Sequence, residues 1–520
     1  MDRIHWNNIF KGENYFDRIF LFVTAVLLHA LFWTFAPPYF MPNYMLDTME
    51  MMVIGQNWVV STFKHPAFQG WAVEIFLILF RHAEFVPYLA SQTACLLTVF
   101  VVWKFAQQIL TPKLALLAAL TLLSYIYFHF SSTLYNNQTF MRFFWVLTIY
   151  FLYNALEKNQ QHYWIFTGIT LGLGMYCKFT VAILIITIVM FMFFEQQARK
   201  YWKTPGPYLS TGVCFLITLP LLFWLIQYYS SMMSYTFNSI GKTESEFWDH
   251  LISPTRFFIK QIPIILILLI PLYGMLGFRW HFDVNKIHSS PAGRYLTFFI
   301  FVPIIIQLII ALVCAGYMRT ALGCHLWLLL PLFLLYTVKI PAEKEKFYSR
   351  SIKLVFVNIF VWAIIWIFII QFSPLVTGRA SRYHFPGKEL AQKVQTIWSE
   401  YNSTPIPFVR GDDCLTEAAC VYNDSRPTVY STLWATEEQF SQKGGILLWQ
   451  ITEHGKSPRR PIVDCFGNHD FSYSPITGTP DDWLKQFPNV IKLPPIELEQ
   501  KTIIKVAPVK IGIAIVPPTK

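Results

Sequence analysis

The chain has 520 residues, of which 54% are hydrophobic and 14% charged, and its mean hydropathy is +0.42. Ordinary soluble domains carry about 25% charged residues, so this composition excludes them and indicates a protein that crosses a membrane many times. The net charge of +11 does not indicate a nucleic-acid binder, because few charges are spread over a long chain, and an excess of Lys and Arg in cytoplasmic loops explains it.

Apolar runs that approach the length of a membrane span, about 20 residues, recur along the chain. We predict about eleven membrane helices, of which the first, at 18–36, lacks a cleavage site and is therefore retained. The others are expected at 85–104, 113–131, 139–156, 163–177, 178–194, 208–228, 257–276, 295–315, 322–338 and 352–372. The segment 66–80 is short and carries Glu74, so we interpret it as a helix lying along the membrane surface.

The distribution of Lys and Arg supports this interpretation of 66–80. With the N-terminus in the cytoplasm, the basic clusters from Lys104 to the loop ending at Lys353 fall on the cytoplasmic side. A full span at 66–80 would reverse most of them, against the positive-inside rule. The first loop, 37–84, is therefore expected on the outer side.

The polar tail, 376–520, begins where the hydropathy collapses, and follows a predicted transmembrane domain at 1–375. We expect a soluble α/β domain on the outer side. Helices are predicted at 387–401 and 414–423, and strands at 405–411, 427–431, 444–451, 502–509 and 511–516. Cys414, Cys420 and Cys465 would supply one disulfide and leave one thiol, with the pairing open.

Polar residues gather in or beside the loops predicted to face outward. They are Asp47, Glu50, Lys64 and His65 in the first loop, Asn136 and Asn137, Lys178, and Arg319 with His325. Ionisable residues near a membrane are costly and usually serve function, so their collection at one face predicts a site there.

The stretch `DTME` has two interpretations. Asp47 as N-cap and Glu50 three residues later would form a capping box. Alternatively, a carboxylate at the membrane surface would accept the proton of an acceptor hydroxyl while a lipid-borne donor lies alongside.

The basic and amide residues also have two interpretations each. Lys64, Lys178 and Arg319 would either extend to the lipid headgroups or stabilise a phosphate leaving group. His65 would cap the helix that Pro66 begins, unless it lies beside that phosphate. Asn136 and Asn137 suit turns, with sugar binding as the alternative.

Several motifs are missing from the sequence. It contains no Walker A loop, no GxGxxG after a strand, no HExxH and no GxSxG. A soluble nucleotide-bound donor is therefore disfavoured, and a donor carried in the membrane fits better. No metal site is predicted. Asp47 and Glu50 are oxygen ligands that a divalent cation would accept, but two carboxylates are too few to assert a site.

At these residues the sequence resembles the polyprenyl-phosphate-sugar-dependent GT-C glycosyltransferases, bacterial relatives of protein O-mannosyltransferases. Within that family it is most similar to the lipid A aminoarabinose transferases and to the galacturonosyltransferases of lipid A and lipopolysaccharide core. The matching pieces, in chain order, are `DTMEMMVIGQNW`, `FKHPAFQGW`, `YNNQTFMRFFW`, `MYCKFTVAIL`, `GCHLWLLLPLF`, `RYHFPGKELAQKVQTIW`, `GDD` and `YNDSRPTVYS`.

The resemblance implies a GT-C fold and an inverting sugar transfer at the periplasmic face of a bacterial inner membrane. Asp47 would occupy the family's catalytic acidic position, with Glu50 supporting it. Lys64 and His65 would lie near the donor phosphate, with Lys178 and Arg319 as further candidates for that anion.

Three departures from the family pattern bear on the sugar. Thr48 follows Asp47 where the family has a second acid, `HPP` is replaced by `HPA`, and Asn136 and Asn137 stand where the aminoarabinose transferases carry an Asp. These differences favour a resemblance to the galacturonosyltransferases over one to the aminoarabinose transferases.

The expected function is therefore transfer of a sugar from a polyprenyl phosphate carrier to a lipid A, core or other envelope glycolipid acceptor. Two alternatives remain. A lipid-linked sugar transporter or flippase would place ionisable residues at mid-membrane and often shows internal repeats, which this sequence lacks. A protein O-mannosyltransferase differs only in its acceptor.

Overall fold

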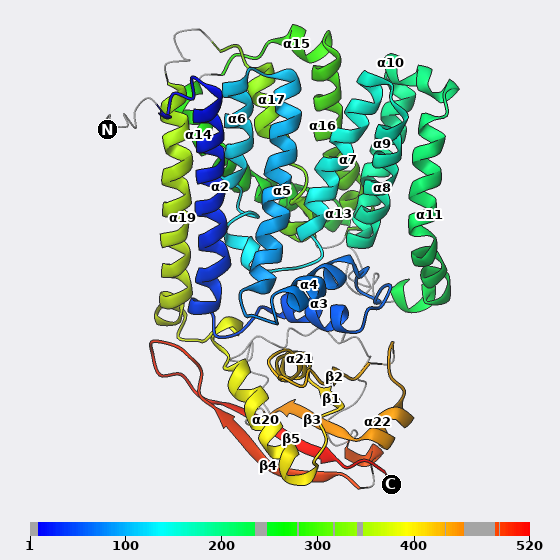
Figure 1. The fold of residues 1–520 in the computed structure, drawn as a ribbon, viewed down its shortest axis with the longest axis vertical. Coiled ribbons are helices and arrows are strands. Elements are labelled where there is room, and N and C mark those ends of the chain that lie inside the picture. Colours follow the sequence, from blue (N-terminus) through cyan, green and yellow to red (C-terminus); the bar gives the residue numbers. More distant parts are fainter. Residues whose placement is uncertain are drawn as a thin grey trace. The chain divides into compact units, whose positions relative to one another are not determined.

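The computed structural model describes residues 9–233, 247–277, 280–315, 318–340, 347–431, 433–451, 484–487 and 489–519 (Figure 1). Its contacts divide the chain into two compact units. The first, which we call the membrane unit, comprises Met1–Thr34, Leu89–Thr133 and Asn137–Ile364. The second, the loop–tail unit, comprises Phe35–Tyr88, Leu134–Asn136 and Ile365–Lys520. The predicted boundary between domains at residues 375 and 376 stays a prediction.

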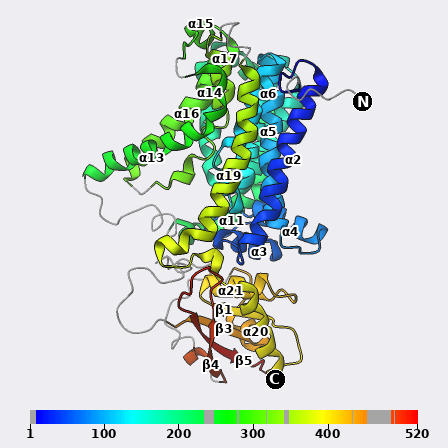
Figure 2. The same cartoon turned by 90° about the vertical axis from the view of Figure 1, so that its left-hand side faces the viewer.

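Seven helices in the described part of the chain are long and apolar enough to cross a membrane. They overlap seven predicted spans and are α2 (Tyr15–Phe40), α5 (Val86–Ile109), α7 (Thr139–Lys158), α11 (Gly206–Gln227), α13 (Phe247–Leu268), α16 (Pro291–Cys314) and α19 (Tyr348–Thr377). The largest shift is in α13, which begins ten residues before the predicted span at 257–276. The most apolar stretches of α5 and α7 are 72% buried, whereas those of α11 and α13 are only 17% and 22% buried. Figure 2 shows α13 leaning away from the other helices. The exposed apolar faces of α11 and α13 are suited to lipid contact.

The other four predicted spans form helices that are shorter or bent in the described residues, and the bent pair, counted as one, would be an eighth helix long and apolar enough to cross a membrane. They correspond to α6 (Pro112–Thr121) with η1 (Leu122–Ser124), to α8 (Gln161–Cys177), to η3 (Phe179–Val181) with α9 (Ala182–Phe194), and to α17 (Leu330–Thr337). Hydropathy identifies a run of apolar residues, but it does not show where the helix formed by that run is interrupted. The remaining elements of this unit are η2 (Phe130–Thr133), α10 (Gln196–Arg199), η4 (Lys200–Lys203), α14 (Ile270–Leu276), α15 (Val284–His288) and η5 (Thr320–Gly323).

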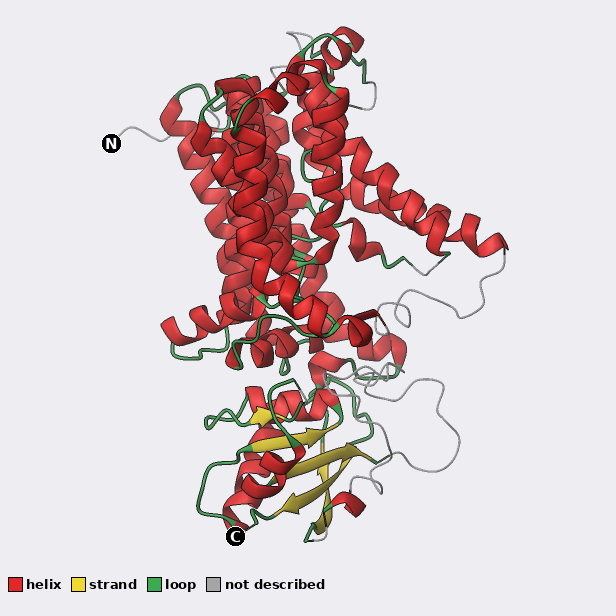
Figure 3. Ribbon diagram, turned by 90° about the vertical axis from the view of Figure 1, so that its right-hand side faces the viewer, coloured by secondary structure: helices red, strands yellow, loops and turns green. Residues whose placement is uncertain are grey.

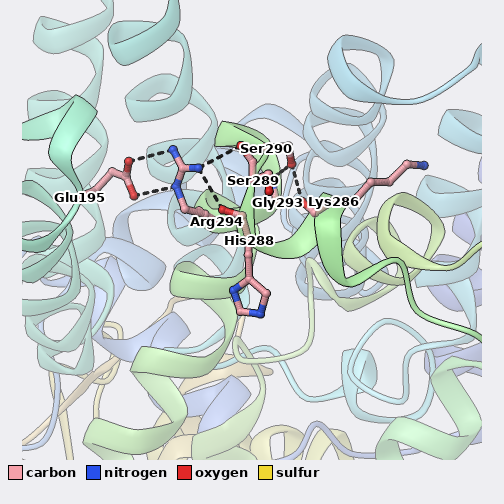
Figure 4. Close-up of polar contacts among 7 residues, drawn as sticks. All are labelled: Glu195, Lys286, His288, Ser289, Ser290, Gly293 and Arg294. Atoms are coloured by element: carbon pink, nitrogen blue, oxygen red, sulfur yellow. Dashed lines mark hydrogen bonds and ion pairs between the residues drawn. The ribbon is translucent and has the colours of Figure 1, made fainter.

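The break after α9 is held by an arginine from the start of α16. The helical axis turns by 90° between η3–α9 and α10–η4, and Glu195 lies at the turn. Both carboxylate oxygens of Glu195 accept from Arg294, at 3.0 Å each (Figure 4). The same guanidinium donates to the carbonyls of His288 and Ser289 at 3.0 and 3.1 Å. This one residue therefore fixes the end of α9 to the connection between α15 and α16.

The first loop folds into two short helices that cross at a pair of glycines. α3 spans Leu46–Gln56 and α4 spans Phe68–Leu79, so the helix predicted at 66–80 is present, while its place along a membrane surface stays a prediction. A Cβ on Gly55 would collide with the carbonyl oxygen of Gly70, and one on Gly70 would lie 2.7 Å from Ile54 Cγ2. The close crossing therefore requires glycine on both helices.

Tyr135 ties these two helices together. Its backbone N–H donates to Thr48 Oγ1 on α3 at 3.0 Å, and its hydroxyl donates to the carbonyl of Gln69 on α4 at 2.7 Å. Tyr135 is fully buried. The short segment 134–136 thus completes the first-loop structure, although it is distant in sequence.

The tail forms a mixed five-stranded sheet, drawn yellow in Figure 3. Its strands lie in the order β2 (Thr428–Val429), β1 (Phe408–Gly411), β3 (Gly445–Gln450), β5 (Val509–Val516) and β4 (Ile491–Leu498). β1 is parallel to β2 and β3, whereas β5 is antiparallel to β3 and β4. The helices are η6 (Arg382–His384), α20 (Gly387–Tyr401), α21 (Asp413–Val421) and α22 (Glu437–Lys443). The predicted soluble α/β fold is therefore confirmed.

One predicted strand was wrong. Residues 502–508 are not in a strand, and the neighbour of β5 is instead β4, at Ile491–Leu498. Its sequence `IKLPPIEL` contains two prolines, which argue against a strand in a sheet interior. The structure accommodates them because β4 is an edge strand whose register shifts between Leu493 and Ile496.

Both faces of the sheet are buried. One face carries an aromatic core in which Phe440 of α22 packs with Phe408, Leu447 and Ala514. Alternate residues of β3 point to the other face, and α21 packs against β1, β2 and β3.

Two of the three tail cysteines lie in α21. Cys414 is disulfide-bonded and Cys420 is a free, buried thiol, whereas Cys465 lies outside the described residues.

Within the loop–tail unit, the first loop is joined to the tail by ion pairs, by ring stacking and by hydrogen bonds. Arg426 forms a bidentate ion pair with Glu74 of α4 at 2.7 and 2.8 Å, and the Glu74 side chain is only 5% exposed. Tyr422 stacks on Tyr44, with ring centroids 5.0 Å apart, and its hydroxyl accepts from the Tyr44 N–H at 2.7 Å. Lys388 pairs with Glu84 at the surface.

We expect Arg426→Met to lower the free energy of unfolding by about 3–5 kcal/mol, because it leaves the buried Glu74 carboxylate without a partner. Lys388→Met, which breaks the exposed pair, should cost less than about 1 kcal/mol. Thermal and denaturant unfolding of the full chain would measure both. Adding Glu74→Gln to Arg426→Met should recover most of the loss, and equal effects of the two single variants would contradict this account.

Candidate functional site

The capping interpretation of `DTME` is excluded by where α3 begins. The helix starts at Leu46, its N-cap is Met45, and no side chain caps it. Asp47 therefore lies inside the first turn, half-buried, and Glu50 lies about one turn later and is 3% exposed. Neither carboxylate is explained by capping, so both are available for another role.

Glu50 pairs with Lys64, which approaches from the turn between α3 and α4. Lys64 Nζ lies 3.3 Å from Glu50 Oε1, and the two side chains are 19% and 4% exposed. The turn is tight because the Thr62 N–H donates to the carbonyl of His65 at 2.8 Å and the His65 N–H donates to Thr62 Oγ1 at 3.1 Å. A lysine in a buried ion pair does not extend freely into lipid headgroups.

His65 is not a helix cap. α4 begins at Phe68 with Ala67 as its N-cap, so Pro66 and His65 lie in the turn before it. His65 is half-buried beside Lys64.

Two carboxylates that sequence reasoning missed join this cluster from α21. The helix packs against α3, and Asp413 and Glu417, four residues apart, share one of its faces. Asp47, Glu50, Asp413 and Lys64 all act electrostatically on Glu417, which is 2% exposed. We name these five residues the acidic cluster. The sequence feature that would have identified Glu417 is a single glutamate among small and apolar residues of a predicted helix.

The motif `GDD` sets the start of α21. Gly411 has a φ of 142°, and a Cβ there would collide with the carbonyl of Leu448 in β3. The Asp412 carboxylate accepts the Gln450 N–H at 2.7 Å. The strand end is thus fixed against β3, which aims the following Asp413 toward the cluster.

Burial and crowding keep protons on the acidic cluster. Burial raises the pKa of Glu50 to about 7, with repulsion from Asp47 and Asp413 adding to the effect and Lys64 opposing it. Burial, then repulsion from Glu50 and Asp413, raises the pKa of Glu417 well above its usual value. Glu417 is therefore protonated at neutral pH, while Glu50 shares its charge with Lys64.

Among the described side chains, no group of three or more His, Cys, Asp or Glu residues is arranged to hold a metal ion.

A second set of predicted residues lies in the membrane unit, around Cys324 and His325. Lys178, the C-cap of α8, acts electrostatically on both residues. Arg142, in the first turn of α7, hydrogen-bonds to the thiols of Cys95 and Cys324.

Arg142 is a further residue that sequence reasoning missed. It is 3% exposed, its guanidinium lies 5.9 Å from the centre of the Tyr127 ring, and its Nε has no hydrogen-bond partner. In the part of the chain that the structure describes, no carboxylate pairs with it. A single Arg within an apolar span was the available signal.

The remaining candidates are dispersed. Arg319 is exposed and precedes η5. Asn136 is half-buried in the loop–tail unit, and Asn137 is buried in the membrane unit. Their roles stay predictions.

The pKa shifts predict how stability depends on pH. Between about pH 5 and pH 8 the native state holds protons on Glu50 and Glu417 that the unfolded chain releases, so stability should fall as pH rises. Glu417→Gln should flatten this slope and melt at a higher temperature than wild type at about pH 8. Melting curves of the purified full chain would measure this, with the exposed Glu438→Gln as control. Equal slopes for wild type and Glu417→Gln would contradict the burial of a proton at this residue.

The solved structures that match the chain include proteins from two organisms. ArnT from Cupriavidus metallidurans, in the apo state and bound to undecaprenyl phosphate, is 11% identical, with TM-scores of 0.46 and 0.49; the matches cover 96% of this chain and 99% of ArnT. The Archaeoglobus fulgidus oligosaccharyltransferase complex with Zn and sulfate is 12% identical, with a TM-score of 0.41, covering 83% of this chain and 68% of that one. No curated protein sequence matches the chain.

Sequence comparison with protein families gives one match. Residues 64–224 match the family described as dolichyl-phosphate-mannose-protein mannosyltransferase. The matched range contains Lys64, His65, Asn136, Asn137 and Lys178. The resemblance to relatives of protein O-mannosyltransferases is thus confirmed for residues 64–224.

Proposed function

We propose that the chain transfers a sugar from a polyprenyl phosphate carrier to a lipid A, lipopolysaccharide core or other envelope glycolipid, at the periplasmic face of a bacterial inner membrane. The observation that carries this proposal is the family match over residues 64–224, since that family is named for transfer from a phosphate-linked lipid carrier. The apolar spans fit a substrate that never leaves the membrane.

The acidic cluster supports the chemistry of the acceptor. An acceptor hydroxyl attacks the anomeric carbon, its proton passes to the Asp47 carboxylate, and the bond between that carbon and the carrier phosphate breaks with inversion. Asp47 is half-buried at the start of α3, whereas Glu50 is buried and paired with Lys64. Asp47 is therefore assigned as the base, and Glu50 as the residue that positions Lys64.

Cations are needed for the departing phosphate, whose charge develops as the bond breaks. Lys64 and His65 are candidates in the loop–tail unit, and Lys178 and Arg319 in the membrane unit. Arg142 joins the second group. A buried guanidinium without a carboxylate is unfavourable in the ligand-free protein, so an anionic ligand would relieve it.

A protein acceptor is the second candidate, and one observation favours it: the matched family is named for transfer to protein. The same donor and the same base would serve either acceptor. Only the product separates them.

Replacing Asp47 tests the transferase proposal. In a strain lacking the gene, one sugar mass should disappear from lipid A or core, and wild type should restore it. Asp47→Asn should lower transfer by about 10²–10⁴-fold, because the amide cannot accept the proton. Mass spectrometry of lipid A, core and membrane glycoproteins would identify the product and the acceptor class.

The matched control is Asp283→Asn, which changes a carboxylate to an amide at the N-cap of α15 and should leave transfer unchanged, since Asn caps as well as Asp. Full restoration by Asp47→Asn at equal expression would remove Asp47 from catalysis. If the strain lacking the gene accumulated the lipid-linked donor on one leaflet of the membrane, and wild type added no sugar to any acceptor, the transporter alternative would be favoured.

Replacing Arg142 tests the anion site. Arg142→Met should raise the KM for the polyprenyl donor by about 10–100-fold, the effect of losing a charge-assisted hydrogen bond. It should also raise the melting temperature of the ligand-free protein, because a buried unpaired charge is removed. A lower melting temperature with an unchanged donor KM would show that Arg142 serves packing instead.

A further inference from the structure

The tail contains a cleft of about 670 Å³ that none of the predicted site residues lines. One wall is α20, another is the turn after it at residues 402–405, and the third is the turn after α21 at residues 422–425. The volume lies within the usual range for ligand sites, about 300–1,000 Å³. The whole cleft belongs to the loop–tail unit.

The lining is polar but nearly uncharged. Amide and hydroxyl side chains predominate, including Gln392, Gln395, Ser399, Asn402, Asn423 and Ser425, and Asp424 is the one ionisable group besides the Tyr422 phenol. An apolar ligand would need apolar walls, and an anion would need cations that the lining lacks. Amides and hydroxyls offer both donors and acceptors, which a neutral polyhydroxylated ligand uses.

Hydrogen bonds fix the walls of the cleft to each other. Asn423 Nδ2 donates to Gln395 Oε1 at 3.1 Å, which joins the turn to α20. Asn423 Oδ1 accepts from the N–H and hydroxyl of Ser425 at 2.9 and 2.7 Å. Ligand binding therefore requires little reordering of these side chains.

The turn after α21 continues from the cleft to the first loop. Tyr422 lines the cleft and also stacks on Tyr44, two residues before α3. Arg426, directly after the last lining residue, is held by Glu74. A molecule in the cleft thus contacts the segment that is anchored beside the helix carrying Asp47.

We propose that this cleft binds a neutral saccharide, and that in the transfer reaction proposed above it holds the sugar portion of the glycolipid acceptor. The assignment of the saccharide as acceptor rests on that proposed function. The assignment of the cleft as a saccharide site rests on its own lining.

A direct binding experiment tests the site. Saturation-transfer difference NMR of the full chain in detergent micelles would use maltotriose and triacetylchitotriose as neutral probes, with inorganic phosphate as a charged competitor. Ser399 is exposed and lines the cleft, so Ser399→Trp should fill it without unfolding the domain. We expect saturation transfer in wild type and a decrease of about tenfold or more in Ser399→Trp, the loss of a few hydrogen bonds.

The control is Glu400→Trp, at the next residue of α20, which is exposed and outside the lining; it should bind the probes as wild type does. Phosphate should not displace them. The proposal would be overturned if the wild-type protein transferred no saturation to the probes, or if wild type and Ser399→Trp transferred it equally.

A kinetic experiment tests whether the cleft holds the sugar portion of the acceptor. Ser399→Trp should raise the KM for deep-rough lipopolysaccharide by about tenfold and leave the KM for the polyprenyl donor unchanged. Saccharide binding without any sugar transfer by wild type would reject the proposed function but keep the site. Transfer by Ser399→Trp with an unchanged acceptor KM would reject the acceptor role.

Discussion

The buried ion pair between Lys64 and Glu50 is the constraint around which the loop–tail unit is arranged. Its N–O distance is 3.3 Å and the Glu50 side chain is only 4% exposed, so water does little to stabilise the carboxylate charge. Such a pair is stable only where packing fixes both partners. The glycine crossing of α3 and α4 and the two hydrogen bonds of Tyr135 provide that packing.

The position of this pair also explains the charges around it. Three more carboxylates, Asp47, Asp413 and Glu417, lie close enough to interact with Lys64 or Glu50. One ammonium group cannot neutralise four ionised carboxylates, so the most buried of the unpaired acids keeps its proton. Asp47 and Asp413 are half-buried and are the more accessible carboxylates of the acidic cluster.

The tail is therefore part of the candidate site. α21 supplies two members of the acidic cluster, and the turn after it holds the first loop through Tyr422 and Arg426. The same turn forms one wall of the polar cleft. In the transfer reaction that we propose, the acceptor carries both a membrane anchor and a sugar head, and the polar cleft would hold the sugar head.

The sequence by itself determined the apolar spans, the α/β nature of the tail, and the polar character of the first loop. These follow from hydropathy, period and residue type, which are local properties. The number of full spans stays a prediction, because four of the predicted spans form shorter or bent helices and an apolar run does not show where its helix breaks. The sequence analysis placed a strand at 502–509 and missed the edge strand at Ile491–Leu498, whose two prolines are unusual in a strand.

Only the tertiary structure decided which charges meet. Asp47 and Glu50 fitted a capping box until the helix start at Leu46 removed that role. Glu417 and Arg142 each stood alone in an apolar stretch of sequence. Glu417 is important because it is buried beside charged residues from segments far away in the chain. Arg142 is important because it is buried and its Nε has no hydrogen-bond partner. Electrostatic energies depend on distance and solvent exposure, and neither is encoded in local sequence.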